Sequence, residues 1–430
     1  MSTLHVGPTE TYHTIAAAMN SAIGGDTIAL DTGYSNESAL VDKQNITVRG
    51  TSSSLDIVLT LGAGIGALTL KGNAPIAVHD NSGTNTITGN ANDRLFVDYS
   101  TATATVTGTV TNITDHGANS VTYTGIENLT LKTGSGNDTV TLGDGNNLIF
   151  THKGNDTITA GNGNNRIHGG VGNDTITAGN GNNHLSGGRG DDTMTGGGGH
   201  NALTGGRGDD TLNGGSGHDI LIGGTGINTL NGHAGTATAS YSPSTEAVTV
   251  SLALGTAQAV NSLETDTLTN IDNLTGSRHK DTLTGNSGNN VLTGGLGADH
   301  LNGRGGSDTF VYRSVNDSTS TAYDTITGFN ASHDKFEFTG PVRGINSEIT
   351  SGHLSASSFD SHLAKVIGAS QLGAHHAVLF TPTSGTLSGD TFLIVDANGH
   401  AGYQAGHDLV IELTSASHLS SLSSSDFIHI

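Results

Sequence analysis

Aspartate returns along the middle of the chain at a fixed interval. It occupies five positions that stand 18 residues apart: Asp138, Asp156, Asp174, Asp192 and Asp210. Halfway between them the same position holds asparagine, at Asn147, Asn165, Asn183 and Asn201. Stacked carboxylates repel one another unless cations lie between them, whereas stacked Asn side chains hydrogen-bond as a ladder. The spacing therefore predicts a column of cation-binding carboxylates on one side and a column of amides on the other.

The overall composition also favours cations as partners. The 430 residues include 16 Lys and Arg against 38 Asp and Glu, a net charge of −22. Nucleic acids and anionic membranes need a basic footprint, so both are poor partners. Cysteine is absent, which leaves neither disulfides nor thiolate metal sites. The sequence has no apolar run of 18 residues and no basic-then-apolar leader, so we expect neither a transmembrane helix nor a cleaved secretory signal.

Motifs for enzyme chemistry are missing from the sequence. It contains no His-Glu-x-x-His, no Gly-x-Ser-x-Gly and no P-loop. Several carboxylates near the N-terminus are expected in solvated turns rather than as acid–base pairs: Asp26, Asp31, Glu37, Asp42 and Asp56. No catalytic residue is assigned, and the sequence favours a protein without enzymatic activity.

Histidine is frequent, at 21 residues, and two of these residues occupy equivalent repeat positions. His200 and His218 should stack about 5 Å apart if 18 residues make one coil. They are close enough to share a borderline metal such as Zn²⁺. The simpler interpretation is that both are polar residues at the surface of a turn.

Nine-residue repeats are the elements that must position these side chains. From Gly134 to Gly232 the chain runs through eleven units without a slip, with Gly at the third position and an aliphatic residue at the seventh. A second block, residues 277–312, holds four more units. Six Gly-rich residues suit a turn, because Gly readily takes φ > 0, and the other three suit a short strand. Units must stack to bury their aliphatic side chains. Two units make an 18-residue coil, and eleven make a rod of roughly 26 Å.

The repeats resemble the RTX nonapeptide family, Gly-Gly-x-Gly-x-Asp-x-aliphatic-x. Gly169-Gly-Val-Gly-Asn-Asp174 and Gly187-Gly-Arg-Gly-Asp-Asp192 are full copies. The resemblance implies a parallel β-roll that binds several Ca²⁺ ions between successive turns, through Asp carboxylates and glycine carbonyls. The residues then expected to hold calcium are Gly134, Gly136, Asp138, Gly154, Asp156, Gly170, Gly172, Asp174, Gly188, Gly190, Asp192, Gly206, Gly208, Asp210, Gly217, Asp219, Asp281, Gly295, Gly297, Asp299 and Asp308.

The alternation of Asp and Asn predicts that calcium occupies one edge of the first block. We expect ions along Asp138 to Asp210 and an almost metal-free edge along Asn147 to Asn201. His152 replaces a glycine, which should weaken the site around Asp156.

The flanking segments carry further resemblances. Residues 14–22 have the apolar spacing of a short helix, followed by alternating strands, like the entry of pectate-lyase-like right-handed β-helices. Two spacers, residues 102–131 and 237–274, resemble each other and are interpreted as scaffold. Residues 324–338 resemble the end of serralysin-type rolls, in which Phe329, Phe336 and Phe338 would plug the core and Asp324 and Asp334 would add Ca²⁺ ligands. The Ser-rich end, residues 419–430, resembles an uncleaved signal for type I export.

Together these features predict an all-β parallel solenoid. Its predicted parts are a β-helix-like region with a spacer (1–133), a first β-roll (134–232), a β spacer (233–276), a second roll with its closing segment (277–340), and a C-terminal cap with the export signal (341–430).

Three functions remain open at this point. The first is a secreted, non-enzymatic calcium-binding structural protein of an extracellular matrix, surface layer or adhesion system, which folds on meeting calcium outside the cell. The second is a protein that binds or modifies an extracellular polysaccharide through its N-terminal β-helix. Such a protein should present aromatic side chains there, and the candidates are Tyr12, Tyr34, Phe96, Tyr99 and Tyr123. The third is a lattice or filament that forms by end-to-end stacking.

Overall fold

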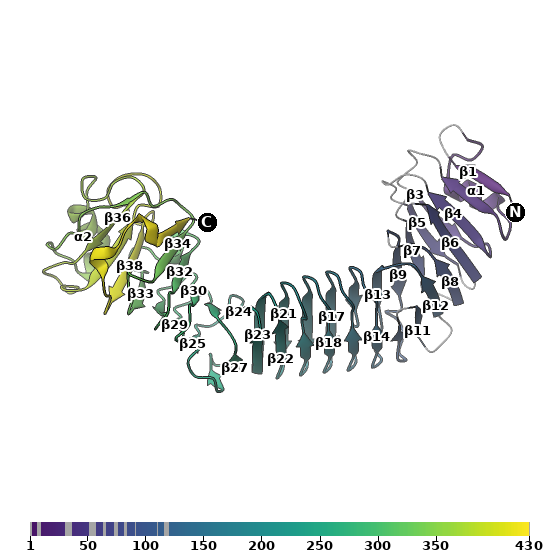
Figure 1. The fold of residues 1–430 in the computed structure, drawn as a ribbon, viewed down its shortest axis with the longest axis horizontal. Coiled ribbons are helices and arrows are strands. Elements are labelled where there is room, and N and C mark those ends of the chain that lie inside the picture. Colours follow the sequence, from purple (N-terminus) through teal and green to yellow (C-terminus); the bar gives the residue numbers. More distant parts are fainter. Residues whose placement is uncertain are drawn as a thin grey trace. The chain divides into compact units, whose positions relative to one another are not determined.

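The computed structural model describes residues 2–6, 10–30, 37–50, 57–62, 66–72, 76–80, 84–90, 92–109, 111–115 and 120–429. The chain forms two compact units, Met1–Asp219 and Ile220–Ile430. Both consist mainly of stacked, largely parallel strands (Figure 1), which confirms the predicted parallel β-solenoid. Among the described residues, no helix has the length and apolar character needed to span a bilayer.

The first unit is built from two long ladders of strands. In pairing order, the first ladder consists of β1 (Thr3–Val6), β2 (Thr27–Leu30), β4 (Ile46–Gly50), β6 (Gly66–Gly72), β8 (Thr84–Thr88), β12 (Ser120–Thr124), β11 (Asn112–Thr114), β10 (Thr107–Gly108), β14 (Thr139–Thr141), β16 (Thr157–Thr159), β18 (Thr175–Thr177), β20 (Thr193–Thr195) and β22 (Thr211–Gly215). The second consists of β3 (Glu37–Val41), β5 (Ile57–Leu61), β7 (Ile76–Asp80), β9 (Arg94–Asp98), β13 (Asn128–Lys132), β15 (Leu148–Phe150), β17 (Arg166–Val171), β19 (His184–Arg189) and β21 (Ala202–Arg207).

The entry to this unit matches the predicted helix and strands. Helix α1 (Ile15–Ser21) begins after Thr14, whose side chain accepts a hydrogen bond from the Ala17 N–H, as an N-cap should. Ile15, Ala18 and Met19 of the helix are buried. The following strands alternate buried and half-buried side chains, as in β2 and β7. The N-terminal region and the first repeats therefore share one continuous pair of ladders.

The repeats wind with the predicted period of 18 residues. Val140 pairs with Ile158, and Ile158 with Ile176, on one ladder, while Ile149 pairs with Ile167 on the other. All of these aliphatic side chains are buried. One expectation was wrong: β17, β19 and β21 are six residues long rather than three. The main chain of their glycines continues the pairing, for example Gly170 with Gly188.

Both spacers return to the solenoid in the same way. The buried Tyr99 and Tyr241 each donate their main-chain N–H to the strand that leads into the next repeats, at Lys132 O and Thr275 O, both 2.8 Å away. Each spacer also contains an antiparallel pair, β10 with β11 in the first and β26 (Gln258–Ala259) with β27 (Glu264–Thr269) in the second. The predicted likeness of the two spacers is thus a likeness of structure.

The second unit continues the same style of winding. Strand β23 (His218–His233) crosses the boundary between the units. One parallel ladder holds β24 (Thr236–Ser240), β28 (Asn273–Thr275), β30 (Val291–Thr293), β32 (Thr309–Tyr312), β34 (Lys335–Phe338) and β39 (Phe427–His429). The other holds β25 (Thr249–Ser251), β29 (Thr282–Thr284), β31 (His300–Asn302), β33 (Asp324–Thr327) and β38 (Leu409–Thr414).

A C-terminal lobe completes the second unit. Strands β37 (Thr391–Val395) and β36 (His376–Phe380) extend the sheet from β38 in antiparallel fashion, and β35 (Gly344–Ile345) pairs with β36. Helix α2 (Phe359–Val366) packs Phe359 and Leu363 into an apolar core with Phe380 and Phe392. Single turns of 3-10 helix lie at Val315–Asp317, Ala356–Ser358, Leu419–Ser421 and Ser424–Asp426.

The end of the roll is closed by aromatic side chains, as predicted, but with an addition. Phe329 and Phe336 are fully buried, with ring centroids 4.6 Å apart. The Ser-rich C-terminal segment then adds β39 to β34 and places Phe427 against Phe336, with centroids 5.5 Å apart. The segment that resembles an export signal is therefore folded onto the roll.

Candidate metal centre

The five aspartates of the first block form a column along one edge of the first unit. Asp138 Oδ1 accepts the main-chain N–H of Val106 at 2.7 Å, and each later Oδ1 accepts the main-chain N–H of the aspartate one coil earlier. Asp138 donates to Asp156 at 2.7 Å, Asp156 to Asp174 at 2.9 Å, and Asp174 to Asp192 at 2.8 Å. The same bond joins Asp192 to Asp210. Half of each carboxylate is therefore committed to holding adjacent coils together.

The second carboxylate oxygen is the one left for a ligand. Among the described residues, the Oδ2 atoms of Asp138, Asp156, Asp174 and Asp192 are buried and have no hydrogen-bond partner. These aspartates are at most 1% exposed. A buried carboxylate oxygen without a partner is costly, and a bound cation would remove that cost.

Main-chain carbonyl groups supply further oxygens between the coils. Gly188 and Gly190 are left-handed, with φ of 124° and 120°. A Cβ on Gly188 would lie 2.2 Å from the carbonyl oxygen of Gly170 in the previous coil. The turn thus needs glycine. A Cβ on Gly169 would likewise lie 2.2 Å from Asp174 Oδ2 and 3.0 Å from the Gly187 carbonyl oxygen, so a carbonyl and a carboxylate oxygen approach the same point. Hard oxygen donors at flexible geometry are what Ca²⁺ prefers, so the acidic edge fits this ion.

The electrostatics of the column point the same way. Burial raises the pKa of Asp156, Asp174, Asp192 and Asp210 to about 7 in each case, with neighbouring carboxylates adding to the effect. A carboxylate whose pKa is raised by burial and by like charge lacks a positive partner. The raised pKa values therefore favour neutralisation of the column, by protons or by cations, near neutral pH.

The asparagines form the predicted ladder on the opposite edge. The Nδ2 of Asn147 donates to Oδ1 of Asn165 at 3.0 Å, and that of Asn165 donates to Oδ1 of Asn183 at 3.1 Å. The Nδ2 of Asn165 also lies 3.0 Å from the carbonyl of Gly161 and 3.1 Å from that of Gly163. The amide nitrogen thus donates to the carbonyl oxygens that would otherwise be available to a cation.

Turns of similar sequence therefore take two conformations. The first glycine of the turn is left-handed at Gly170, Gly188 and Gly206 on the acidic edge, whereas Gly161 and Gly179 on the amide edge are not. The division is not strict, because Gly197 and Gly215 on the amide edge are left-handed as well. His152, which replaces this glycine on the acidic edge, still adopts φ of 65°. Its carbonyl accepts the Val171 N–H at 2.8 Å. The turn before Asp156 thus keeps the left-handed backbone of Gly170 and Gly188 despite the substitution.

The predicted glycines lie where the turns pass closest to the previous coil. Gly134 and Gly136 face the main chain of residues 102–105. The remaining predicted glycines all have a left-handed backbone; they are Gly154, Gly170, Gly172, Gly188, Gly190, Gly206, Gly208, Gly217, Gly295 and Gly297.

Asp219 ends the amide edge rather than the acidic one. Its Oδ1 accepts both the N–H and the Nδ2 of Asn201, each at 2.9 Å. Its Oδ2 is buried and has no partner among the described residues. One terminal position of the amide edge is therefore acidic.

The second block repeats the column of aspartates, but some of its carboxylate oxygens already accept hydrogen bonds. Asp281 donates its N–H to Asp299, and Asp299 donates to Asp324, each at 2.8 Å. Within the described part of the chain, the Oδ2 atoms of Asp299 and Asp324 have no partner. Asp281 differs, because Ser277 donates its N–H to Oδ2 and its hydroxyl to Oδ1. Asp299 and Asp324 are therefore better candidates than Asp281.

A shorter column faces it within the same block. The N–H of Asn290 donates to Asp308 Oδ1 at 2.8 Å, and that of Asp308 to Asp334 Oδ1 at 3.0 Å. Asp334 Oδ2 already accepts the Asn330 N–H at 2.8 Å. Asp334, unlike Asp324, therefore has both oxygens engaged.

The N-terminal carboxylates do not converge on a site. Asp26 was expected in a solvated turn, but it is buried and accepts the N–H groups of Ser2 and Ile23. These main-chain bonds lower its pKa. Asp42 is exposed beside Lys43. Asp31, Asp56 and the side chain of Glu37 lie outside the described residues.

The aromatic residues of this region are largely inaccessible. Tyr99 and Tyr123 are buried. Phe96 lies between His79, with centroids 4.6 Å apart, and the Lys132 ammonium, 5.1 Å from its ring. Tyr12 is half-buried, and Tyr34 lies outside the described residues.

The two histidines stack as predicted but form no recognisable metal site. The rings of His200 and His218 have centroids 5.0 Å apart, and His200 Nδ1 accepts the His218 N–H. Among the described residues, no group of three or more His, Cys, Asp or Glu side chains is placed to hold a metal.

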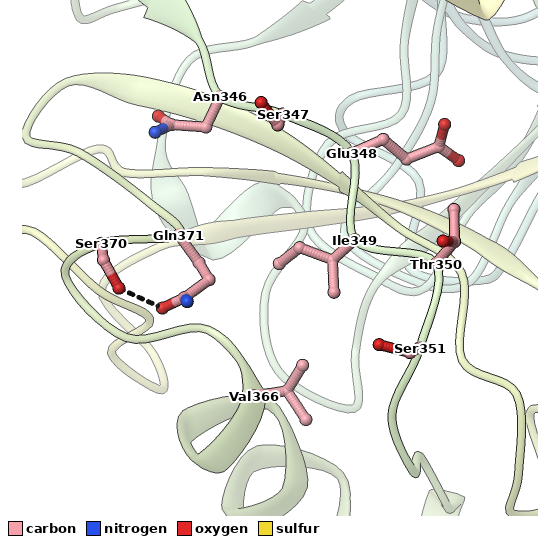
Figure 2. A pocket seen from close by; sticks show the side chains of 9 residues that line it. All are labelled: Asn346, Ser347, Glu348, Ile349, Thr350, Ser351, Val366, Ser370 and Gln371. Atoms are coloured by element: carbon pink, nitrogen blue, oxygen red, sulfur yellow. Dashed lines mark hydrogen bonds between the residues drawn. The ribbon is translucent and has the colours of Figure 1, made fainter.

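A surface hollow of about 530 Å³ lies in the C-terminal lobe (Figure 2). Polar and aliphatic side chains line it, and Glu348 is its one ionisable lining residue. Ser370 donates its hydroxyl to Gln371 Oε1 at 2.8 Å on one side. This lining offers no acid–base pair and no ligand set.

The second spacer contains a buried acidic cluster that was not predicted from the sequence. Asp266 accepts Asn228 Nδ2 and the Tyr241 hydroxyl, each at 2.9 Å. Burial and the neighbouring Asp266 raise the pKa of Glu264 to about 8. The register of β27 on β23 places Asp266 beside Asn228, so Asp266 continues the repeat position across the spacer. Nothing in the spacing of the sequence signals this.

Comparison with known proteins identifies the repeats. Residues 130–158, 159–194, 195–230, 213–236 and 275–310 match the RTX calcium-binding nonapeptide repeat. No curated protein matches the chain. The chain thus carries calcium-binding RTX repeats within residues 130–310.

Proposed function

We propose that this protein is a secreted, non-enzymatic calcium-binding structural protein whose folding is completed by Ca²⁺ outside the cell. Calcium is held along Asp138, Asp156, Asp174, Asp192 and Asp210, and in the second unit by Asp299, Asp324 and Asp308. The Asn147-to-Asn201 edge binds none. The observation that carries the proposal is the column of buried Oδ2 atoms without partners at Asp138, Asp156, Asp174 and Asp192.

Calcium supplies charge neutralisation and bridges adjacent coils when it is bound. The protein's own residues hold each Oδ1 on the previous coil and keep Oδ2 and the glycine carbonyls facing the gap between coils. At a cytosolic calcium level the column lacks its cations. Extracellular modules typically bind calcium at about 0.1–1 mM, and metal binding then becomes folding free energy.

The C-terminal segment fits this order of events. Leu422 and Phe427 are at most 9% exposed in the folded protein. Export machinery that reads this segment must therefore meet it before it packs onto the roll. RTX repeat proteins are typically secreted, and calcium-dependent folding after export would make the passage directional. A matrix, surface-layer or adhesion role would suit a protein built from stacked coils that calcium bridges.

Circular dichroism and calorimetry of the full chain test the proposal. Calcium should increase the β signal, and a chelator should reverse the change. Asp192→Asn should remove part of the calcium binding, because it replaces a ligand oxygen with an amide. Asp191→Asn is the matched control, since it removes the same charge from the exposed neighbouring residue.

Two results would contradict the proposal. One is a well-folded β spectrum that a chelator leaves unchanged. The other is equal calcium binding by the Asp192→Asn and Asp191→Asn variants, which would place the ions outside the column.

A further inference from the structure

A second kind of acidic site lies in the C-terminal lobe, outside the repeats. Residues 396–408, here called the acidic loop, connect β37 to β38 and begin and end with an aspartate. Asp396 is 1% exposed and Asp408 is fully buried. The repeat match ends at residue 310, so the nonapeptide pattern does not account for this loop.

The main chain of the loop closes around these two carboxylates. Asp396 Oδ1 accepts the N–H of Gly399 at 2.8 Å, and its Oδ2 accepts the N–H of His375 at 2.9 Å. Asp408 Oδ2 accepts the N–H of Gln404 at 2.7 Å. Asp408 is thereby tied back into the loop that precedes it.

The remaining oxygen of Asp408 has no partner. Its Oδ1 is buried without a hydrogen bond among the described residues. No ion pair to Asp396 or Asp408 occurs in the described part of the chain. Two buried carboxylates near each other without a positive group are strongly unfavourable. The surroundings of Asp396 and Asp408 therefore favour a bound cation.

The loop also offers the right class of additional donors. Gly399, Gly402 and Gly406 are all left-handed, with φ of 78°, 90° and 73°. This geometry lets a short loop curl tightly. Within the loop, the Gln404 side-chain amide donates to the carbonyl groups of Ala401 and Gly402. The described residues contain no group of three or more His, Cys, Asp or Glu side chains placed to hold a metal. Oxygen donors from carboxylates and main-chain carbonyls suit Ca²⁺ rather than zinc.

We infer that the acidic loop binds one Ca²⁺ ion through Asp408 Oδ1, with Asp396 contributing to the charge that attracts it. The inference rests on the proposed function only in requiring calcium at extracellular concentrations. The ion would link folding of the C-terminal lobe to calcium independently of the repeats. The Tyr403 hydroxyl donates to Asp360 of α2, so the loop is also joined to the helix of the lobe.

Terbium luminescence can isolate this ion, because Tyr403 lies in the loop itself. Tb³⁺ replaces Ca²⁺ and emits when a nearby tyrosine is excited, and the chain has no tryptophan. In the full chain, Tyr403→Phe should lower the tyrosine-sensitised Tb³⁺ emission while leaving the calcium stoichiometry unchanged. Asp408→Asn should lower the emission and remove one bound calcium.

The repeat variant Asp174→Asn separates this inference from the proposed function. It should reduce calcium binding by the column and leave the Tyr403-dependent emission intact. Unchanged emission in Tyr403→Phe, or unchanged stoichiometry in folded Asp408→Asn, would overturn the loop site. If Asp408→Asn fails to fold, the Tyr403→Phe comparison still decides the question. Failure of the column would instead appear as an unaltered calcium response in Asp174→Asn.

Discussion

At the scale of single residues, the choice between Asp and Asn decides what fills the gap between coils. Both side chains use Oδ1 to accept the N–H of the previous coil, as at Asp174 and Asn165. They differ in the second terminal atom. The Asn165 Nδ2 donates to nearby carbonyl oxygens, whereas Asp174 Oδ2 has no donor. An amide thus satisfies the turn by itself, whereas a carboxylate leaves one buried oxygen for a cation to neutralise.

Asn165→Asp should convert an amide-edge turn into a calcium-requiring turn. Without calcium, the variant loses the donor to Gly161 and Gly163 and buries an unpaired oxygen. We expect its free energy of unfolding in chelator to fall by about 1–3 kcal/mol. Calcium should restore this loss. Urea unfolding with and without calcium measures both effects, and equal stability of variant and native protein in chelator would contradict the account.

The acidic column also predicts the pH dependence of the calcium-free protein. The pKa of Asp174 rises from 3.8 to about 7 in the folded chain because of burial. Between these values the folded chain binds more protons than the unfolded chain, so stability falls as pH rises from about 4 to about 7. Urea unfolding in chelator should therefore give a lower free energy at about pH 7.5 than at about pH 5. A rise over this range would contradict the prediction.

Calcium should reverse this dependence, because the ion and the proton compete for the same oxygens. Binding at neutral pH should release protons, and affinity should increase as pH rises toward about 7. Isothermal titration calorimetry in buffers of different ionisation enthalpy measures the released protons, because the buffer takes them up and the observed heat of binding then depends on the buffer.

At the scale of the element, the glycine turn sets the distance between coils. The backbone of Gly188 is left-handed and its Cα approaches the Gly170 carbonyl. Gly305 lies in a repeat turn of the second unit, where an added Cβ would meet nothing within 4 Å. The repeat thus contains glycines with different structural demands.

Gly188→Ala should be far more destabilising than Gly305→Ala. The left-handed backbone alone costs an alanine about 1–3 kcal/mol, and the contact with Gly170 adds to this. Gly305→Ala should stay within about 0.5 kcal/mol of the native protein. Thermal or urea unfolding in calcium compares the two variants, and equal losses would show that close coil approach does not limit this position.

Elements also show how far the sequence predicts the fold. The period of 18, helix α1 and the two edges follow from spacing, because each repeats a local rule. The extension of β17 through Gly169 and Gly170, the burial of Asp26 and the capture of Asp281 by Ser277 do not. These three features depend on which main-chain groups the neighbouring coil presents. The sequence of one coil does not specify the main-chain groups of its neighbour.

At the scale of the whole molecule, the proposed calcium binding would link stability to location. Each site that binds only the folded chain adds about 2.7 kcal/mol when calcium stands at 100 times its dissociation constant. Several sites together would exceed the 5–15 kcal/mol by which domains are usually stable. A chain with a net charge of −22 is in this sense incomplete without its cations.

The repeat pattern does not predict strand β39, which closes the roll. Residues 419–430 were predicted only as an export signal, yet β39 pairs with β34 and Phe427 packs on the aromatic plug. A non-local strand of three residues cannot be inferred from local periodicity. The same segment thus has two roles in the proposed sequence of events, before and after folding.

The central claim is that calcium lies along one edge of the first repeat block and not along the other. An anomalous difference map from crystals of the calcium-loaded protein tests it most directly. The account predicts peaks beside the Oδ2 atoms of Asp156, Asp174 and Asp192, and none beside Asn165 and Asn183. Peaks of equal height along both edges, or none beside the aspartates, would contradict it.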